Sequence, residues 1–129
     1  MATNVSFACA INCMDGRAQD AVKNYIKEKY GVDFVDVVTE PGPCRILAEH
    51  SDMPVVEDMK KRLAISVERH GSKVVALAAH AECAGDPCSK EEQLEHLREA
   101  KKMIESFGFD IPVILLWVGE GWQKAELVT

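Results

Sequence analysis

Residues 5–17 read VSFACAINCMDGR, an apolar run that passes abruptly into polar and charged residues. The apolar part, residues 5–12, is too short for a typical helix and predicts a strand buried on both faces. A second short apolar run, residues 74–79, ends in the same way at His80-Ala81-Glu82-Cys83. Strands buried on both faces are typical of parallel sheets covered by helices, so the two runs indicate an α/β protein.

Helix-like and strand-like patterns alternate along the rest of the chain. Apolar residues recur with a helical period in residues 18–29, 54–70 and 89–107, and a glycine follows each of these segments. Residues 40–43, Glu-Pro-Gly-Pro, are expected to form a loop because proline interrupts both helices and strand pairing. The expected strands are residues 5–12, 34–39, 74–79, 112–118 and 122–128.

This order predicts one domain over residues 1–129, with a mostly parallel sheet of about five strands and helices on both faces. The last two strands are joined by only about three residues, which is too short for a parallel crossover, so the last strand should run antiparallel. Sites in open α/β sheets form beyond the carboxyl ends of strands, where the strand order reverses. Cys13 and His80 lie at such ends, and they would meet if the first and third strands are neighbours.

Composition excludes several classes of partner. The chain has 129 residues, of which 47% are hydrophobic, and a net charge of −6, which argues against a nucleic-acid partner. No apolar run is long enough to span a membrane, and the N-terminal residues 1–4 lack the features of a signal peptide. Five cysteines are an odd number for a disulfide framework. We therefore expect a cytoplasmic protein whose cysteines are thiols available to a metal.

Cys13, His80 and Cys83 form a Cys₂His set, which is typical of zinc sites. His80 and Cys83 are three residues apart, so a single turn can direct both side chains toward one ion. The pair alone is a weak signal, and Cys13 at another strand end strengthens it. Three protein ligands leave a fourth position for water, as in catalytic zinc sites. Cys88 is an alternative fourth ligand that would close the site and favour a structural zinc.

Asp15 and Arg17 follow Cys13 closely and allow two interpretations. They could form a surface ion pair of little energetic consequence. Alternatively, Asp15 could bind zinc itself, or Arg17 could hold it off the metal so that it accepts a hydrogen bond from water there.

The remaining cysteines and histidines are expected to have ordinary roles. Cys9 and Cys44 should be small core residues. The other histidines are expected on the solvated surface, namely His50, His70 and His96.

Cys-x-Asp-x-Arg followed by His-x-x-Cys resembles the β-class carbonic anhydrases, and the chain is identified as a short, divergent member of that family. The resemblance implies that Cys13, His80 and Cys83 bind Zn²⁺ and that Asp15 and Arg17 form a catalytic dyad. It also implies a homodimer that hydrates carbon dioxide reversibly to bicarbonate by means of zinc-bound hydroxide. The chain departs from the family pattern at Gly16, at residues 39–43 and at Ala84.

Three other functions are compatible with the same residues. The site could hydrolyse another small electrophile, such as a carbon–sulfur heterocumulene. It could be a non-catalytic zinc domain in which Asp15 or Cys88 is a permanent fourth ligand. It could also be a metal-free thiol enzyme with His80 as the base for Cys13, which leaves Cys83 without a role. A measurement of metal content distinguishes the metal-free thiol enzyme from the two zinc proteins. Inhibition of an activity by small anions distinguishes the hydrolase from the non-catalytic zinc domain.

Overall fold

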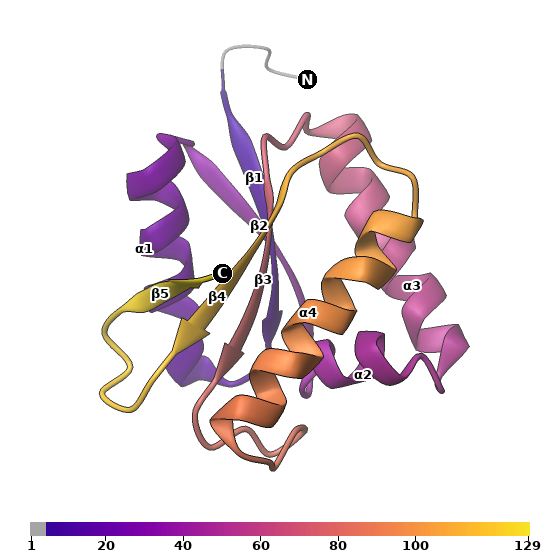
Figure 1. Ribbon diagram of the computed structural model, residues 1–129. Helices are drawn as coiled ribbons and strands as arrows, with labels where there is room; N and C mark the ends of the chain where they lie inside the picture. The colour runs from indigo at the N-terminus through magenta and orange to yellow at the C-terminus, as the bar shows by residue number, and fades with distance from the viewer. Residues whose placement is uncertain (1–4) are drawn as a thin grey trace.

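The computed structural model describes residues 5–129 of the chain. Residues 1–4, from which the lack of a signal peptide was inferred, lie outside the described residues. The strands are β1 (Phe7–Cys13), β2 (Phe34–Glu40), β3 (Val75–His80), β4 (Val113–Val118) and β5 (Ala125–Val128). They form one sheet in the order β2-β1-β3-β4-β5, in which only the β4–β5 pair is antiparallel (Figure 1). The predicted fold class and the predicted direction of the last strand are both confirmed.

Helices cover both faces of this sheet. They are α1 (Gln19–Tyr30), α2 (Pro43–Glu49), α3 (Met53–Ala64) and α4 (Lys90–Ser106), with a 3₁₀ turn at Gly16–Ala18 and a π-helical turn at Ile65–Arg69. Figure 1 shows α1 on one side of the sheet and the other three helices on the opposite side. Ser89 caps α4 by accepting a hydrogen bond from the Glu92 N–H, as its capping-box sequence predicts. No helix within residues 5–129 is long and apolar enough to cross a membrane.

The expectation of a loop over residues 40–43 was wrong at both ends. Glu40 is the last residue of β2, and Pro43 is the first residue of α2, a helix that the sequence analysis did not predict. Proline is tolerated at a first helical position because the backbone nitrogen there has no partner within the helix. Gly42 precedes α2 at a φ of 64°, a conformation that glycine adopts readily.

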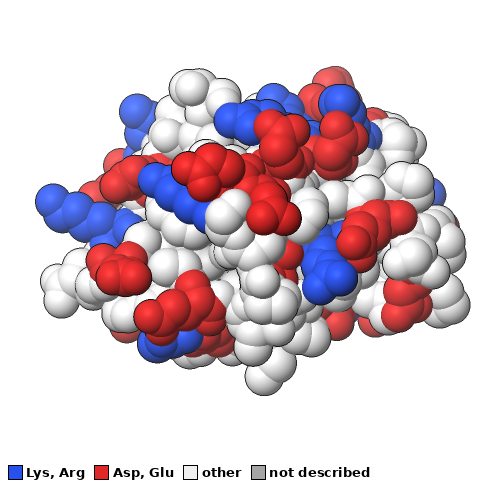
Figure 2. All heavy atoms as spheres, turned by 60° about the horizontal axis from the view of Figure 1, so that its bottom comes forward, with Lys and Arg blue, Asp and Glu red and all other residues white. Residues whose placement is uncertain are grey.

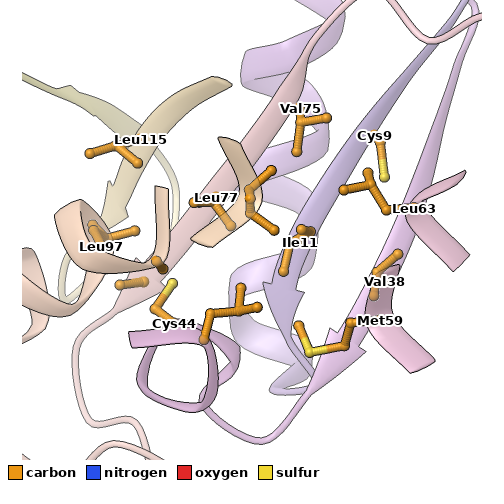
Figure 3. Packing of buried hydrophobic residues seen from close by; sticks show 14 of the residues in the cluster. Cys9, Ile11, Val38, Cys44, Met59, Leu63, Val75, Leu77, Leu97 and Leu115 are labelled. Atoms are coloured by element: carbon orange, nitrogen blue, oxygen red, sulfur yellow. The ribbon is translucent and has the colours of Figure 1, made fainter. Parts of the chain in front are cut away.

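Strand β1 is covered by apolar side chains on both faces, as its sequence predicts. Cys9 and Ile11 face α2, α3 and α4, whereas Ala8 and Ala10 belong to the cluster on the α1 side. Figure 3 shows the larger cluster, in which the buried thiol of Cys44 lies among leucine and isoleucine side chains. The core roles expected for Cys9 and Cys44 are therefore confirmed. In contrast to this apolar core, Figure 2 shows that the surface at the carboxyl ends of the strands carries acidic and basic side chains interspersed with one another.

Candidate metal centre

The carboxyl ends of β1 and β3 bring Cys13, His80 and Cys83 together. The two strands pair in parallel, so Cys13 and His80 emerge at the same edge of the sheet, and Cys83 follows three residues after His80. The sulfur atoms of Cys13 and Cys83 are 3.8 Å apart, and one ligand atom from each of the three residues lies within 4.8 Å of the others. All three residues are buried. The meeting of Cys13 and His80 was conditional on adjacent first and third strands, and the pairing of β1 with β3 meets that condition.

The imidazole of His80 is oriented for metal binding. Its Nδ1–H donates a hydrogen bond to the carbonyl oxygen of Ala81 at 2.7 Å, which leaves the lone pair on Nε2. That Nε2 is fully buried and has no hydrogen-bond partner. A buried polar atom without a partner is energetically costly, and a cation bound to Nε2 would remove this cost.

The pKa values of Cys13 and Cys83 are shifted in opposite directions. Contact with the Cys83 sulfur lowers the pKa of Cys13, and the backbone N–H groups of Gly42 and Asp15 act in the same direction. The Cys13 sulfur in turn raises the pKa of Cys83, and burial adds to this effect. Cys13 is therefore the more acidic of the two thiols, and a metal ion would bind both residues as thiolates.

This donor set fits zinc. Zn²⁺ prefers sulfur and nitrogen donors in tetrahedral geometry, and two thiolates with one neutral imidazole supply three of its four ligands. The three side chains line a small, partly open cavity with a volume of about 10 Å³. Its other lining residues are Gly42, Pro43, Cys44, Ala78, Ala79, Asp86 and Gln93.

Asp15 is bound to Arg17 and does not belong to the three-residue ligand group. Its Oδ2 accepts a hydrogen bond from Arg17 NH2 at 2.8 Å, and its Oδ1 accepts from Arg17 Nε at 3.1 Å. Oδ1 also accepts from the backbone N–H of Arg17, which caps the 3₁₀ turn. The hydrogen bonds from Arg17 lower the pKa of Asp15 to about 2. The carboxylate is thus ionised and held by Arg17.

Two further residues that the sequence analysis missed contact Arg17. Glu82 accepts a hydrogen bond from Arg17 NH1 at 3.0 Å through its Oε1. The indole ring of Trp122 lies against the guanidinium, with 4.1 Å between Arg17 Cζ and the ring centroid. Glu82 could have been noticed because it lies between His80 and Cys83, whereas nothing in the local sequence marks Trp122.

Cys88 belongs to a different group of side chains, together with Asp86 and His96. The buried carboxylate of Asp86 accepts a hydrogen bond from Cys88 Sγ at 3.1 Å and lies 2.6 Å from His96 Nδ1. These are hydrogen-bond distances, so the group satisfies Asp86 without a metal. Nothing in this arrangement supports Cys88 as a fourth ligand of a metal held by Cys13, His80 and Cys83.

The surface positions expected for the histidines are correct only for His50, which is exposed. His70 and His96 are partly buried, and each contacts a carboxylate, Asp36 and Asp86 respectively. The expectation was wrong because it rested on charged neighbours along the chain, whereas both carboxylates come from other segments.

Comparisons with known proteins agree with this architecture. The family described as "Putative carbonic anhydrase" matches residues 3–128 of the chain. A search of curated proteins gave no significant match.

Several solved structures share the fold. The carbonic anhydrase of Streptococcus mutans superposes with a TM-score of 0.64 at 18% identity, over 94% of this chain and 81% of that one. A β-carbonic anhydrase of Trichomonas vaginalis gives a TM-score of 0.60 at 16% identity, over 98% and 87% of the two chains. The apo form of a carbon disulfide hydrolase gives 0.53 at 11% identity, over 95% and 78%. The chain therefore belongs to the carbonic anhydrase family that matches it, as a divergent member with the β-class fold.

Proposed function

We propose that the chain is a zinc enzyme that hydrates carbon dioxide reversibly to bicarbonate. In this proposal Cys13, His80 and Cys83 hold Zn²⁺, and Asp15 and Arg17 are the catalytic dyad. The observation that carries it is the orientation of His80, whose buried Nε2 has no hydrogen-bond partner and lies beside two cysteine sulfurs. The family match supports carbonic anhydrase chemistry in particular.

The ligand residues would fix both the charge and the geometry of the site. The Ala81 carbonyl holds His80 in the tautomer that presents Nε2, and backbone N–H groups stabilise the Cys13 thiolate. Zinc held by these residues would supply a nucleophile near neutral pH, because zinc in catalytic sites lowers the pKa of water from about 15.7 to about 7.

Asp15 and Arg17 would orient the attacking water. Arg17 donates to both carboxylate oxygens of Asp15, so the carboxylate is held in one place as an ionised acceptor. An acceptor fixed in this way can take a hydrogen bond from water and direct its lone pair toward a substrate. The reaction adds water to carbon dioxide, forms a carbon–oxygen bond and releases bicarbonate and a proton.

The cavity suits a small uncharged substrate. Its wall includes the apolar side chains of Pro43, Ala78 and Ala79. Carbon dioxide carries no charge that an ion pair could recognise, so an apolar wall next to the ligands is the appropriate surface for it.

A carbon–sulfur heterocumulene is the second candidate substrate. Such a molecule is also small, linear and uncharged, and the chain shares its fold with a carbon disulfide hydrolase. Hydrolysis would replace carbon–sulfur bonds with carbon–oxygen bonds and release hydrogen sulfide. The same ligand set would serve both reactions, and the shape of the cavity would decide between them.

The experiment that tests the proposal is stopped-flow hydration of carbon dioxide by protein of known zinc content, from about pH 6 to about pH 9, a range that brackets the expected pKa of water on zinc. Zinc-dependent hydration that small anions inhibit would support carbonic anhydrase activity. Hydrogen sulfide release from carbon disulfide without hydration would favour the second candidate. Neither activity in zinc-loaded protein would contradict both and favour a non-catalytic zinc domain.

We also propose that the protein is a cytoplasmic homodimer. All five cysteines are free thiols, which suits a reducing compartment. The strands β2 and β5 are the two edges of the sheet, and an open edge in so small a protein favours coverage by a second subunit.

A further inference from the structure

Three separate segments hold the guanidinium of Arg17. Asp15 binds its Nε and NH2 from the segment after β1. Glu82, after β3, accepts from NH1 through Oε1 and from NH2 through its backbone carbonyl, at 3.0 Å and 3.4 Å. Trp122, between β4 and β5, covers one face of the guanidinium at 4.1 Å. Arg17 is therefore restrained at its edges and on one face, although its side chain is 44% exposed.

Glu82 and Trp122 make these contacts from an unusual backbone conformation. Their φ angles are 56° and 62°, in the left-handed region that residues other than glycine seldom adopt. A bulky residue there is strained, and such strain persists only where the surrounding structure enforces it. Of the three non-glycine residues with positive φ within residues 5–129, these two contact the same guanidinium.

Trp122 also reaches the candidate metal ligands. Its ring packs edge-on against the imidazole of His80, with 5.9 Å between the ring centroids. The indole thus contacts both Arg17 and His80, and it packs against the apolar cluster on the α1 face of the sheet. Because Trp122 lies in the turn between β4 and β5, the position of Arg17 depends on the position of that turn.

We propose that Glu82 and Trp122 are positioning residues that hold Arg17 where it keeps the Asp15 carboxylate away from the metal ligands. We call this pair the Arg17 clamp. The inference rests on the proposed function, because it concerns the same metal centre.

The clamp is needed because Asp15 has two competing partners. Its carboxylate can bind Arg17, or it can turn toward a cation held by Cys13, His80 and Cys83 and occupy the position that water requires. An ion pair between partly exposed side chains is weak by itself when the arginine is free to rotate. The additional hydrogen bonds to Glu82 and the stacking on Trp122 reduce that freedom, and so favour the Arg17-bound position of Asp15.

The test compares cobalt-substituted variants, because the absorption spectrum of bound Co²⁺ reports its ligands. Trp122→Gly removes the ring and suits the positive φ, so the hairpin turn itself is not strained further. Trp122→Phe is the matched control that keeps an aromatic face. We expect the wild type and Trp122→Phe to share one spectrum, and Trp122→Gly to show altered ligand-field bands.

The double variant Trp122→Gly/Asp15→Asn identifies the new ligand. If the Asp15 carboxylate causes the change, the double variant should regain the ligand-field bands of the wild type. An unchanged spectrum in Trp122→Gly, or an altered one that persists with Asp15→Asn, would overturn the proposal. A wild type without sulfur-to-cobalt charge-transfer bands would instead contradict the proposed metal centre.

Two further measurements complete the test. Glu82→Gln should change the cobalt spectrum in the same direction as Trp122→Gly, whereas Glu120→Gln, a change at an exposed position in the same hairpin, should not. Nitrogen NMR of the metal-free protein examines the clamp without the metal. A slowly exchanging Arg17 Nε–H signal in the wild type and in Trp122→Phe, but not in Trp122→Gly, supports the clamp, and equal exchange in all three contradicts it.

Discussion

Gly42 and Gly85 touch through their backbones, although one follows β2 and the other follows β3. A Cβ atom added to Gly42 would lie 2.7 Å from the carbonyl carbon of Gly85. A Cβ on Gly85 would clash with the backbone of Pro41. The two loops that touch here also support the metal ligands. The N–H of Gly42 lowers the pKa of Cys13 and the N–H of Gly85 lowers the pKa of Cys83, so each stabilises a thiolate.

Gly85→Ala should therefore weaken metal binding. The new methyl group would push the two loops apart and move both N–H donors, and overpacking against backbone typically costs about 1–3 kcal/mol. We expect zinc affinity, measured by competition with a chelator, to fall roughly tenfold or more, as is usual when groups that support a ligand are lost. Gly16→Ala is the control, because a Cβ at Gly16 meets nothing within 4 Å. Equal affinities in the two variants would contradict this role of the contact.

The ligand assignment predicts about one zinc per chain. Cys83→Ser should lose most of the metal, because it removes one of the three ligands, as measured by elemental analysis after dialysis. Cys44→Ser and Cys88→Ser should keep the zinc, since the Cys44 thiol donates a hydrogen bond to the Ala78 carbonyl and the Cys88 thiol donates one to Asp86. Chelation of the zinc should also lower Tm, because a ligand of the native state stabilises it. Equal loss of zinc from all three variants would indicate a different ligand set.

The dyad assignment predicts that Arg17→Ala keeps its zinc and loses activity. Without the arginine, Asp15 is free to bind the metal and close the fourth position, which a crystal structure of the variant should show directly. Asp15→Asn should also keep zinc but lack the ionised acceptor. Changes of this kind typically reduce activity about ten- to a hundredfold. Full hydration activity in Arg17→Ala would rule out the dyad.

Asp33 makes an acid-sensitive contribution to stability far from the metal centre. The Ser6 backbone N–H and hydroxyl both donate to its Oδ2, and these hydrogen bonds lower its pKa in the folded protein. Because the folded pKa lies below the unfolded value of about 3.9, the contribution is complete above that value and is lost as the pH falls through the folded pKa.

Asp33→Asn should therefore unfold at a lower urea concentration than the wild type near neutral pH. The difference should shrink once the pH falls below the unfolded pKa of about 3.9 and through the lower folded pKa, because the wild-type carboxyl then becomes protonated. Ser6→Ala should show a smaller effect with the same pH dependence. A difference between wild type and Asp33→Asn that is independent of pH would show that the carboxylate charge has no part in it.

The proposed homodimer can be checked by sedimentation. Each chain has a mass of 14.3 kDa, so a dimer should sediment at about twice that mass at micromolar concentration. A mass of one chain under these conditions would exclude a stable dimer.

The sequence by itself determined the five strands, the helices other than α2 and the candidate metal ligands. The apolar runs and helical periods are local properties of the chain, and each predicts its own strand or helix. The short turn before β5 determined that this strand runs antiparallel, because so few residues cannot form a parallel crossover. The two motifs gave Cys13, Asp15, Arg17, His80 and Cys83 as candidates, and the pairing of β1 with β3 in the folded sheet brings Cys13, His80 and Cys83 together.

Only the tertiary structure decided how these residues are held. Trp122 stacks on Arg17, Glu82 binds its NH1, and Gly42 touches Gly85, and each contact joins segments that are distant in the sequence. Such contacts depend on sheet order and on the path of each loop, and no local pattern encodes either. The same reason explains why α2 was missed: its seven residues are few for a helix to be stable alone, and its buried Cys44 and Leu47 pack onto the sheet. Local periodicity thus predicts the elements, while the packing of distant segments determines the environment of the site.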